Sequence, residues 1–180
     1  GTEYRGVTLW MLNDTLEPPE IARQLDGFHE AGWGALITRT FNGLRTPYLG
    51  DEWMEIIRLI IDRAEIHDLK VWLQAGYMPS AIPDLEPAMT HKVLVRKGAG
   101  EPAEEGETLV HQEGDYAYYG RIFPHVLDLL KPEAVADYLR MAYEEPWWSR
   151  FQGAFGETVE TVWVDEPHFR PPLLPWNEEL

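Results

Sequence analysis

Short apolar runs alternate with longer segments of helical periodicity along most of the chain. Runs typical of β-strands occupy residues 6–12, 35–38, 70–74 and 161–164. The first run is apolar without interruption, which is the pattern of a strand buried on both faces of a sheet. Strand-sized runs separated by helix-sized segments predict repeated β-α units.

Three segments with helical periodicity accompany these strands. The first is expected to begin at Pro18 and Pro19, because proline suits the first helical turn, and to stop at Gly32. The second begins at Asp51, which we expect to cap the helix, and its apolar stripe consists of Trp53, Ile57, Ile60, Ile61 and Ala64. The third begins at residues 131–133, and its inner face is expected to comprise Val135, Leu139 and Ala142.

Residues 84–125 interrupt the alternation. They contain two β-like runs, 91–96 and 108–112, separated by a turn rich in Gly, Pro and Glu. We interpret this segment as a β-hairpin inserted after the third strand, a common place for elaboration of a substrate site. Its acidic tip is interpreted as a solvated turn.

The order of elements predicts an α/β fold with a parallel sheet covered by helices. Doubly wound sheets and barrels both have this order, and the nucleotide-binding patterns GxGxxG and GxxxxGK[ST] are absent from the sequence. An eight-stranded barrel usually takes about 250 residues. Four strands in 180 residues therefore predict a single domain, residues 1–180, built as a partial (half) (β/α)8 TIM-type barrel with the inserted hairpin.

Composition narrows the classes of function. The chain has 15 basic and 31 acidic residues and a net charge of −16, which argues against nucleic acid or an anionic membrane surface as a partner. Cysteine is absent, so disulfides, thiolate metal sites and cysteine nucleophiles are excluded. No apolar run approaches the roughly 20 residues of a membrane span. No signal peptide or cofactor motif is visible, no cofactor is predicted, and the compartment is left open.

The strand at residues 161–164 carries the strongest chemical signal, because it ends in two adjacent carboxylates, Asp165 and Glu166. The carboxyl end of a buried parallel strand lies at the edge of the sheet where α/β folds bind ligands. Apolar surroundings there raise the pKa of a carboxyl group and make it a general acid. We interpret Glu166 as this acid, and the alternative is a solvated acidic pair at a strand end.

A glycosidase usually needs a second carboxylate. Neighbouring residues of a strand point to opposite faces, so a cleft-facing Glu166 would share its side with Val162 and Val164, while Asp165 would point to the helices or a neighbouring loop. Asp14, just past the first strand, is the better second candidate, because Asp51 is expected to serve as a helix cap.

Polar and aromatic side chains near strand ends are candidates for substrate binding. The hydroxyl-binding candidates are Asn13, Arg39, Asn42, Gln74, Tyr77, Asp165 and His168, and the alternative for each is an ordinary loop hydrogen bond. Sugar rings stack on aromatic rings, which makes Trp10 and Trp176 candidates among 8 Trp, 8 Tyr and 6 Phe, although core packing explains most aromatics. His168 beside the acidic pair is too weak a signal to predict a metal site.

Four segments together resemble one family. They are TPYLGDEWM (46–54), VWLQAGYMPS (71–80), VLDLLKPEA (126–134), and VDEPHF (164–169) followed by LPWNEEL (174–180). In order and spacing they resemble large bacterial glycoside hydrolases of the alpha-L-rhamnosidase type. The resemblance implies a (β/α)8 catalytic barrel within a longer chain, and Glu166 matches the glutamate proposed to protonate the leaving group. The family's Tyr-Asp-Glu-Asp run after Trp-Leu is replaced here by Gln74, Ala75 and Gly76, and a carboxylate from a later strand is absent.

We therefore predict a glycoside hydrolase-like domain that acts on a carbohydrate with Glu166 as general acid. The alternative is a non-catalytic half-barrel that binds carbohydrate or assembles with itself. Four strands leave two open sheet edges, and edges favour pairing. A homodimer or higher oligomer is expected if the chain is complete, with two Glu166 side chains sharing one mouth. A metal-dependent hydrolase using His168 is the third, weaker hypothesis.

Overall fold

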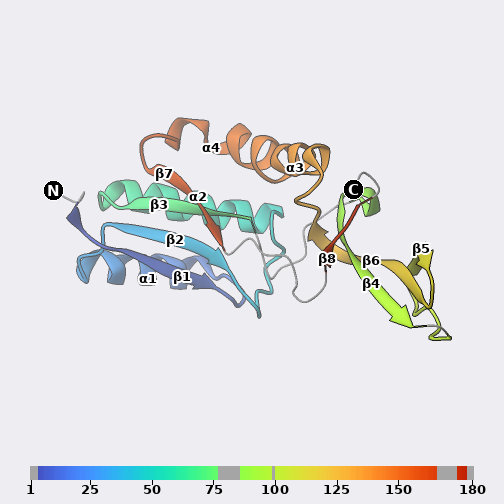
Figure 1. Ribbon diagram of the computed structural model, residues 1–180. Coiled ribbons are helices and arrows are strands. Elements are labelled where there is room, and N and C mark those ends of the chain that lie inside the picture. The colour runs from blue at the N-terminus through green and yellow to red at the C-terminus, as the bar shows by residue number, and fades with distance from the viewer. Residues whose placement is uncertain (1–3, 77–85, 99, 166–173, 178–180) are drawn as a thin grey trace. The chain divides into compact units, whose positions relative to one another are not determined.

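The computed structural model describes residues 4–76, 86–98, 100–165 and 174–177 (Figure 1). The chain forms two compact units. The first unit comprises residues 1–81 and 142–167, and the second comprises residues 82–141 and 168–180. The segment expected to be an insertion therefore lies in a unit of its own.

The first unit contains a four-stranded parallel sheet. Its strands are β1 (Val7–Leu12), β2 (Ala35–Thr40), β3 (Lys70–Gly76) and β7 (Val159–Asp165), which are hydrogen-bonded in that order. Each neighbouring pair is parallel. The four strands expected from the apolar runs are thus present and parallel, and the α/β fold class is confirmed.

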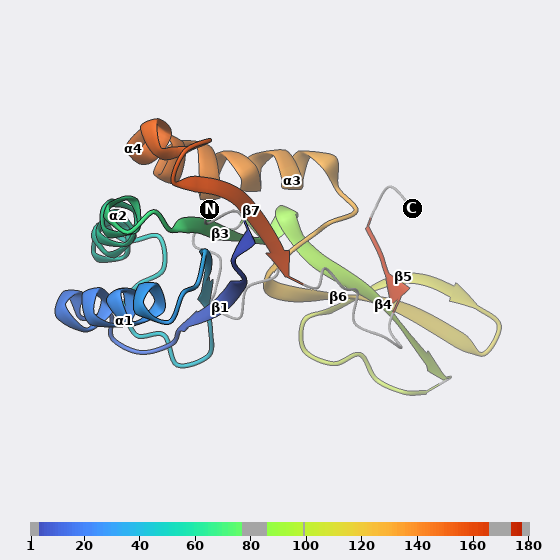
Figure 2. The same cartoon turned by 90° about the vertical axis from the view of Figure 1, so that its left-hand side faces the viewer.

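Helices α1 (Pro18–Glu30) and α2 (Asp51–Ile66) lie side by side against one face of this sheet (Figure 2). The predicted stripe of α2 is buried, and Leu25 of α1 and Leu36 of β2 belong to the same apolar core. Asp26 joins the two helices by accepting hydrogen bonds from Arg63 at 2.5 and 2.6 Å and lying 2.8 Å from the His67 ring. These contacts, chiefly the one from Arg63, lower the pKa of Asp26 to about 2.

Two local expectations for this unit are wrong. Asp51 does not cap α2; Gly50 occupies the cap position, and the Asp51 carboxylate instead accepts a hydrogen bond from Arg150 at 2.9 Å. Strand β1 is not buried on both faces, because Leu9 and Met11 are 43% and 38% exposed. Helices cover the opposite face of β1, and within the described part of this unit no helix covers the face that carries Leu9 and Met11.

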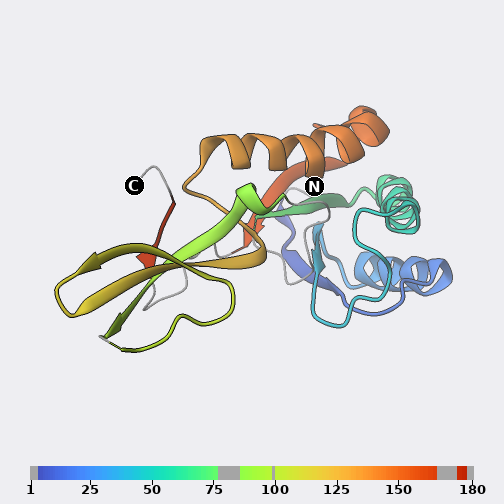
Figure 3. The ribbon, with the colours of Figure 1, turned by 90° about the vertical axis from the view of Figure 1, so that its right-hand side faces the viewer.

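The second unit is an antiparallel sheet with the order β5-β6-β4-β8. Its strands are β4 (Thr90–Gly98, after a short helix η2, Pro87–Met89), β5 (Glu107–Glu113), β6 (Tyr116–Leu127) and β8 (Leu174–Pro175). The two expected strands of the insertion exist, but the expectation that they pair as a hairpin is wrong. Figure 3 shows β5 and β6 as the hairpin, with β4 on the other side of β6.

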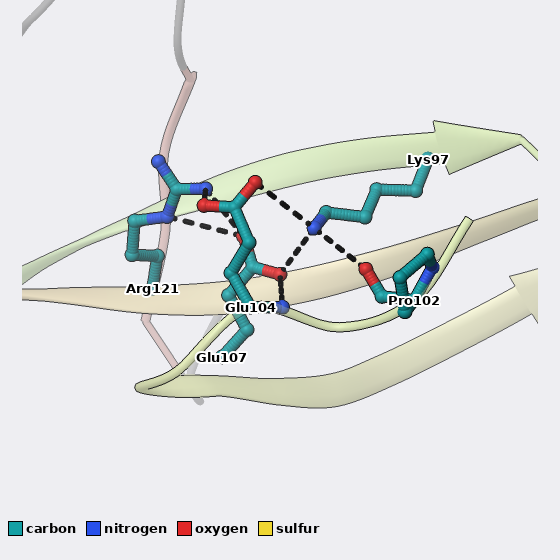
Figure 4. Close-up of polar contacts among 5 residues, drawn as sticks. All are labelled: Lys97, Pro102, Glu104, Glu107 and Arg121. Atoms are coloured by element: carbon teal, nitrogen blue, oxygen red, sulfur yellow. Dashed lines mark hydrogen bonds and ion pairs between the residues drawn. The ribbon is translucent and has the colours of Figure 1, made fainter.

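A cluster of charged side chains ties the three long strands of this sheet together (Figure 4). The Glu107 side chain is fully buried and accepts hydrogen bonds from Arg121 at 2.6 Å, and it forms an ion pair with Lys97 at 2.7 Å. Glu104 pairs with Lys97 at 3.3 Å and with Arg121 at 2.7 Å. Burial acts to raise the pKa of Glu107, but hydrogen bonds from Lys97, the Glu104 backbone N–H and Arg121 lower it to about 2.

The remaining helices are α3 (Pro132–Leu139), η3 (Arg140–Trp148), α4 (Ser149–Phe151) and η4 (Gln152–Ala154). In α3 the buried residues are Ala134 and Tyr138, whereas Leu139 is 47% exposed, so the predicted inner face is wrong in its register. Trp147 and Phe151 join the core of the first unit. Within the described ranges, no helix has the length and apolarity needed to cross a membrane.

Candidate functional site

The carboxyl ends of the four parallel strands meet at one edge of the sheet, which we call the rim. Leu12 of β1 pairs with Thr40 of β2, and Gly76 of β3 pairs with Asp165 of β7. The loops after β1 and β2 are held together by a hydrogen bond from the Leu16 backbone N–H to Thr46 Oγ1 at 2.9 Å. The predicted strand-end residues therefore come from neighbouring positions of one edge.

Glycine is required where these two loops cross. Gly43 has φ +101°, and a Cβ atom at this position would lie 2.7 Å from the Asn13 carbonyl oxygen. A larger residue would force the loop after β2 away from the loop after β1. The close crossing fixes the backbone of Asn13 and of the neighbouring exposed residue Asn42, both of which were predicted to bind hydroxyl groups.

A row of four side chains crosses the sheet just below the rim, which we call the rim row: Met11, Arg39, Gln74 and Trp163. Met11 pairs with Arg39, and Gln74 pairs with Trp163. Gln74 directly follows Leu73, the partner of Thr38, so it lies at the same level as Arg39. Register partners in a parallel sheet share a face, and this face is the one opposite to α1 and α2.

Aromatic rings surround the guanidinium group of Arg39. Its Cζ atom lies 4.7 Å from the centroid of the Phe41 ring and 6.0 Å from that of the Trp163 ring. Its Nη1 atom lies 3.7 Å from the Met11 sulfur. Such contacts favour a cation over an aromatic face and keep the planar donor group in a defined place.

Gln74 has a bracing role in this arrangement. Its side chain is buried, and its Oε1 atom accepts hydrogen bonds from the Thr40 backbone N–H at 2.8 Å and the Thr40 hydroxyl at 3.0 Å. The Tyr143 hydroxyl donates to the Gln74 backbone carbonyl at 2.8 Å. These bonds join the ends of β2 and β3 to η3. They fix the positions of Arg39 and Trp163 along their strands.

The structure places Trp10, Asn13 and Asp14 around a separate hollow of about 300 Å³ between the end of β1 and the start of α1. Trp10 is 4% exposed, and its indole N–H donates to Gln24 at 2.7 Å. It therefore faces α1, on the side of β1 opposite to the rim row. The Asp14 carboxylate is largely exposed and lies 3.6 Å from Arg45.

Glu17 and Glu20 also belong to the lining of this hollow, which therefore has three acidic residues with Asp14. Hydrogen bonds, first from Arg23 and then from Gln24, lower the pKa of Glu20 to about 2. The carboxylate is thus held ionised by neighbours on its own helix. The hydrogen bonds of Glu20 with Arg23 and Gln24 explain why an acidic residue stands at the start of α1, and no ligand is needed to explain it.

Several predicted residues lie beyond what the structure describes. Tyr77, Glu166 and His168 fall outside the described residues, and Asp165 is placed only by its backbone, as the last residue of β7. Val162 pairs with Leu73 and is 46% exposed; its expected place on the cleft side was conditional on Glu166, so that prediction stays untested. Among the described residues, no group of three His, Asp or Glu side chains could hold a metal ion.

Trp176, also predicted to bind substrate, belongs to the second unit. Its backbone N–H donates to the Lys92 carbonyl at 3.0 Å, and its ring lies over Gly120, where an added Cβ would be 2.8 Å from the indole. The absence of a side chain at Gly120 therefore creates the seat for this ring.

Another hollow lies at the opposite edge of the parallel sheet. It measures about 540 Å³ and is lined in part by Lys70 and Thr158, near the amino ends of β3 and β7. Ligands of parallel α/β folds bind at carboxyl ends instead. The Lys70 ammonium donates to the Glu157 carbonyl at 2.9 Å, and Arg150 is paired with Asp51, so polar groups of this hollow serve the fold.

Residues of the rim row that sequence reasoning missed are Met11 and Trp163, together with Phe41 beside them. Alternation within β7 carries the usable signal, since residues two apart share a face and Trp163 is the last aromatic residue of that strand. The choice of face, however, depended on knowing that Val162 pairs with Leu73.

Comparisons with known proteins give little beyond this geometry. No family model matches the chain, and no curated protein matches it. Among solved structures, the chain is similar to "Structure of Rhamnosidase from Novosphingobium sp. PP1Y", with 20% sequence identity and a TM-score of 0.40. The similarity covers 63% of this chain and 12% of that one, so the chain corresponds to a small part of the rhamnosidase.

Proposed function

We propose that the first unit is part of a glycoside hydrolase-type catalytic domain and that its rim binds a saccharide. The observation that carries this proposal is the Arg39 guanidinium flanked by Phe41 and Trp163 on the face of the sheet opposite to α1 and α2. Ring faces suit the apolar C–H face of a sugar, and a guanidinium donates several hydrogen bonds to hydroxyl oxygens. Saccharide sites combine these two properties in a small area.

The proposed architecture is half of a (β/α)8 barrel. The strand order β1-β2-β3-β7 follows the order along the chain without reversal. A doubly wound sheet reverses its strand order at the switch point where it binds ligands, whereas a barrel adds each strand beside the previous one. The described order supports the barrel, and the resemblance of the four sequence segments to alpha-L-rhamnosidase-type hydrolases supports the same proposal.

In the proposed reaction, Glu166 protonates the glycosidic oxygen. Asp14 is not assigned as the second carboxylate, because it lines the hollow beside α1 and not the rim row. The experiment is hydrolysis of a panel of aryl glycosides by the full chain and by Glu166→Gln. The substitution removes the transferable proton but keeps the shape of the side chain. We expect turnover to disappear in the variant while saccharide binding remains, and turnover that persists in Glu166→Gln would refute this role of Glu166.

Binding at the rim is tested separately from catalysis. Arg39→Ala and Trp163→Ala are compared with wild type in calorimetric titrations with the saccharide product of the best aryl glycoside, or with the panel's free sugars if none is hydrolysed. Arg58→Ala and Trp148→Ala are matched controls, because Arg58 lies 5.2 Å from the Phe151 ring in a similar cation–π contact and Trp148 is 54% exposed.

We expect each rim variant to bind roughly tenfold more weakly, the size of one lost cation–π or stacking contact in a partly desolvated site. The two controls should bind as wild type does. Equal losses in rim variants and controls, or unchanged binding in both rim variants, would contradict a saccharide site at the rim row.

A second candidate function is the non-catalytic half-barrel that assembles with itself. The observation that favours it is the exposure of Leu9 and Met11 on the face opposite to α1 and α2, together with β1 and β7, each of which has one strand neighbour in the described part of the sheet. A second copy could bury this face and pair the edges. Sedimentation equilibrium should then show a dimer or higher oligomer, and a stable monomer would exclude this candidate.

A further inference from the structure

The two faces of the antiparallel sheet differ in chemistry. Lys97 pairs with Ala117, and Arg121 pairs with Glu107, which places the charged cluster of Figure 4 on one face. Arg96 precedes Lys97 and pairs with Tyr118, so these residues lie on the other face. This second face carries no part of the buried ion-pair cluster.

Aromatic rings and cations cover this second face, which we call the aromatic face; it is formed by Lys92, Arg96, His111, Tyr116, Tyr118 and Trp176. The Arg96 Cζ atom lies 4.7 Å from the centroid of the Tyr116 ring, and the Lys92 ammonium lies 6.0 Å from that of Trp176. The rings of His111 and Tyr118 are 6.0 Å apart. These contacts join the six side chains in three pairs, which lie on β4, β5, β6 and the residue after β8.

Gly120 lets the aromatic face be continuous. It pairs with Leu94 in β4 and with Thr108 in β5, at the centre of the sheet. The Trp176 ring occupies the space where the side chain of any other residue would lie, since an added Cβ would be 2.8 Å from it. The indole is thereby laid over the strand, and the Lys92 ammonium lies over its partly exposed ring.

The charge of the aromatic face is opposite to that of the chain as a whole. The chain has about two acidic residues for each basic one. The strand residues of the aromatic face include two cations, Arg96 and Lys92, and one carboxylate, Glu113. Glu113 belongs to this face because its register partner is Tyr116. Arg96 is exposed, and it makes no ion pair with any residue that the structure describes. A solvated cation supported by an aromatic ring is a site for an anionic group.

We propose that the aromatic face binds a polysaccharide rich in hexuronate residues. Sugar rings would lie on the aromatic side chains through their C–H faces, and their carboxylates would pair with Arg96 and Lys92. One charge per sugar ring matches two cations spread over a sheet face. At physiological ionic strength, charges farther than about 8 Å are screened, so the local cations outweigh the acidic remainder of the chain.

Single-stranded nucleic acid also stacks on aromatic rings beside cations, and it is tested as a competing ligand below. The proposal concerns a surface of the second unit and does not depend on the rim of the first. Variants of the two surfaces therefore separate the two proposals.

The test is affinity electrophoresis of the full chain in gels that contain polygalacturonate, with the fully methyl-esterified polymer as the uncharged counterpart. The double variant Arg96→Ala/Tyr116→Ala is compared with Tyr4→Ala/Arg5→Ala, a matched pair of exposed residues in the first unit. Thermal unfolding shows whether each variant is folded, and Arg96→Lys keeps the charge if the double variant is not folded.

We expect wild type to be retarded by polygalacturonate and much less by the ester. The double variant should bind about tenfold more weakly, since it loses one ion pair and one stacking surface. Tyr4→Ala/Arg5→Ala and Arg96→Lys should remain close to wild type. The proposal is overturned if wild type is not retarded or if the ester retards it equally. It is also overturned if the folded double variant binds as wild type does, or if its matched control binds as weakly as the double variant. Preferential binding of oligothymidylate would overturn it as well.

Discussion

The two units of the chain are stabilised in different ways. The buried apolar cluster, which packs α1, α2, Trp147 and Phe151 against the parallel sheet, lies entirely in the first unit. The second unit instead buries a carboxylate, Glu107, between Lys97 and Arg121. In this chain, apolar periodicity specifies the parallel sheet and its helices, whereas the thin antiparallel sheet depends on paired polar groups.

The largest expected effect comes from the apolar core. Ile57→Ala removes a fully buried side chain from the middle of α2 and leaves a cavity, so we expect the free energy of unfolding of the first unit to fall by about 2–5 kcal/mol. Urea denaturation measures this change. Ile66→Ala at the end of the same helix is the control, because Ile66 is 77% exposed and its loss should have almost no effect. Similar losses in the two variants would contradict the core assignment.

The next effect tests the brace beneath the rim row. Gln74→Leu keeps the size of the buried side chain but leaves the Thr40 backbone N–H and hydroxyl without their acceptor, so a loss of about 1–3 kcal/mol is expected. Urea denaturation again measures it, with Gln112→Leu on the exposed face of β5 as the control. A change below the error of the measurement would show that the ends of β2 and β3 do not depend on Gln74.

A smaller effect is expected in the second unit. Glu107→Gln removes the central negative charge while Glu104 remains beside Lys97 and Arg121, so part of the pairing survives. Hydrogen exchange should become faster for the amides of β5 and β6 and stay unchanged in α2. The exposed residue Glu105, changed to Gln, is the control. Faster exchange in both units would mean that the cluster does not act locally.

The smallest effect is the dependence of the second unit on pH. The pKa of Glu107 falls from the usual 4.5 to about 2 on folding, so its ion pairs stabilise the folded state fully above pH 4.5. That contribution is lost as the pH falls toward 2. Protection factors of β5 and β6 should therefore decrease between pH 5 and pH 2 in wild type and less so in Glu107→Gln. If the protection factors of β5 and β6 fall equally with pH in wild type and in Glu107→Gln, the lowered pKa of Glu107 is contradicted.

Sequence reasoning predicted the first unit well and the second unit poorly, for physical reasons. The core stripe of α2 and the parallel strands follow from side-chain periodicity, which is a local property. The pairing of β5 with β6 was missed because residues 114–115 form a short turn within what the pattern presented as one polar segment. Glu107 looked like an acid of a solvated turn, because burial of a carboxylate depends on partners distant in sequence.

The candidate site was predicted in part. Arg39 and Gln74 were recognised as strand-end residues, and the structure brings them into one row. Which face the row occupies could not be predicted, since a bulge between β3 and β7 sets the register and places Val162 opposite Leu73. Trp163 was not predicted for the same reason. Its role depends on its contact with Arg39, which its own sequence context does not indicate.

The central claim, that a saccharide binds at the rim row, is tested most directly by the indole N–H signals of the tryptophans. In ¹⁵N-labelled protein, eight such signals are expected, and Trp163→Phe and Trp53→Phe assign two of them. On titration with the saccharide, the account predicts that the Trp163 signal shifts while that of Trp53, which is 1% exposed in the core, does not. A titration that leaves the Trp163 signal in place, or moves both signals alike, would contradict the account.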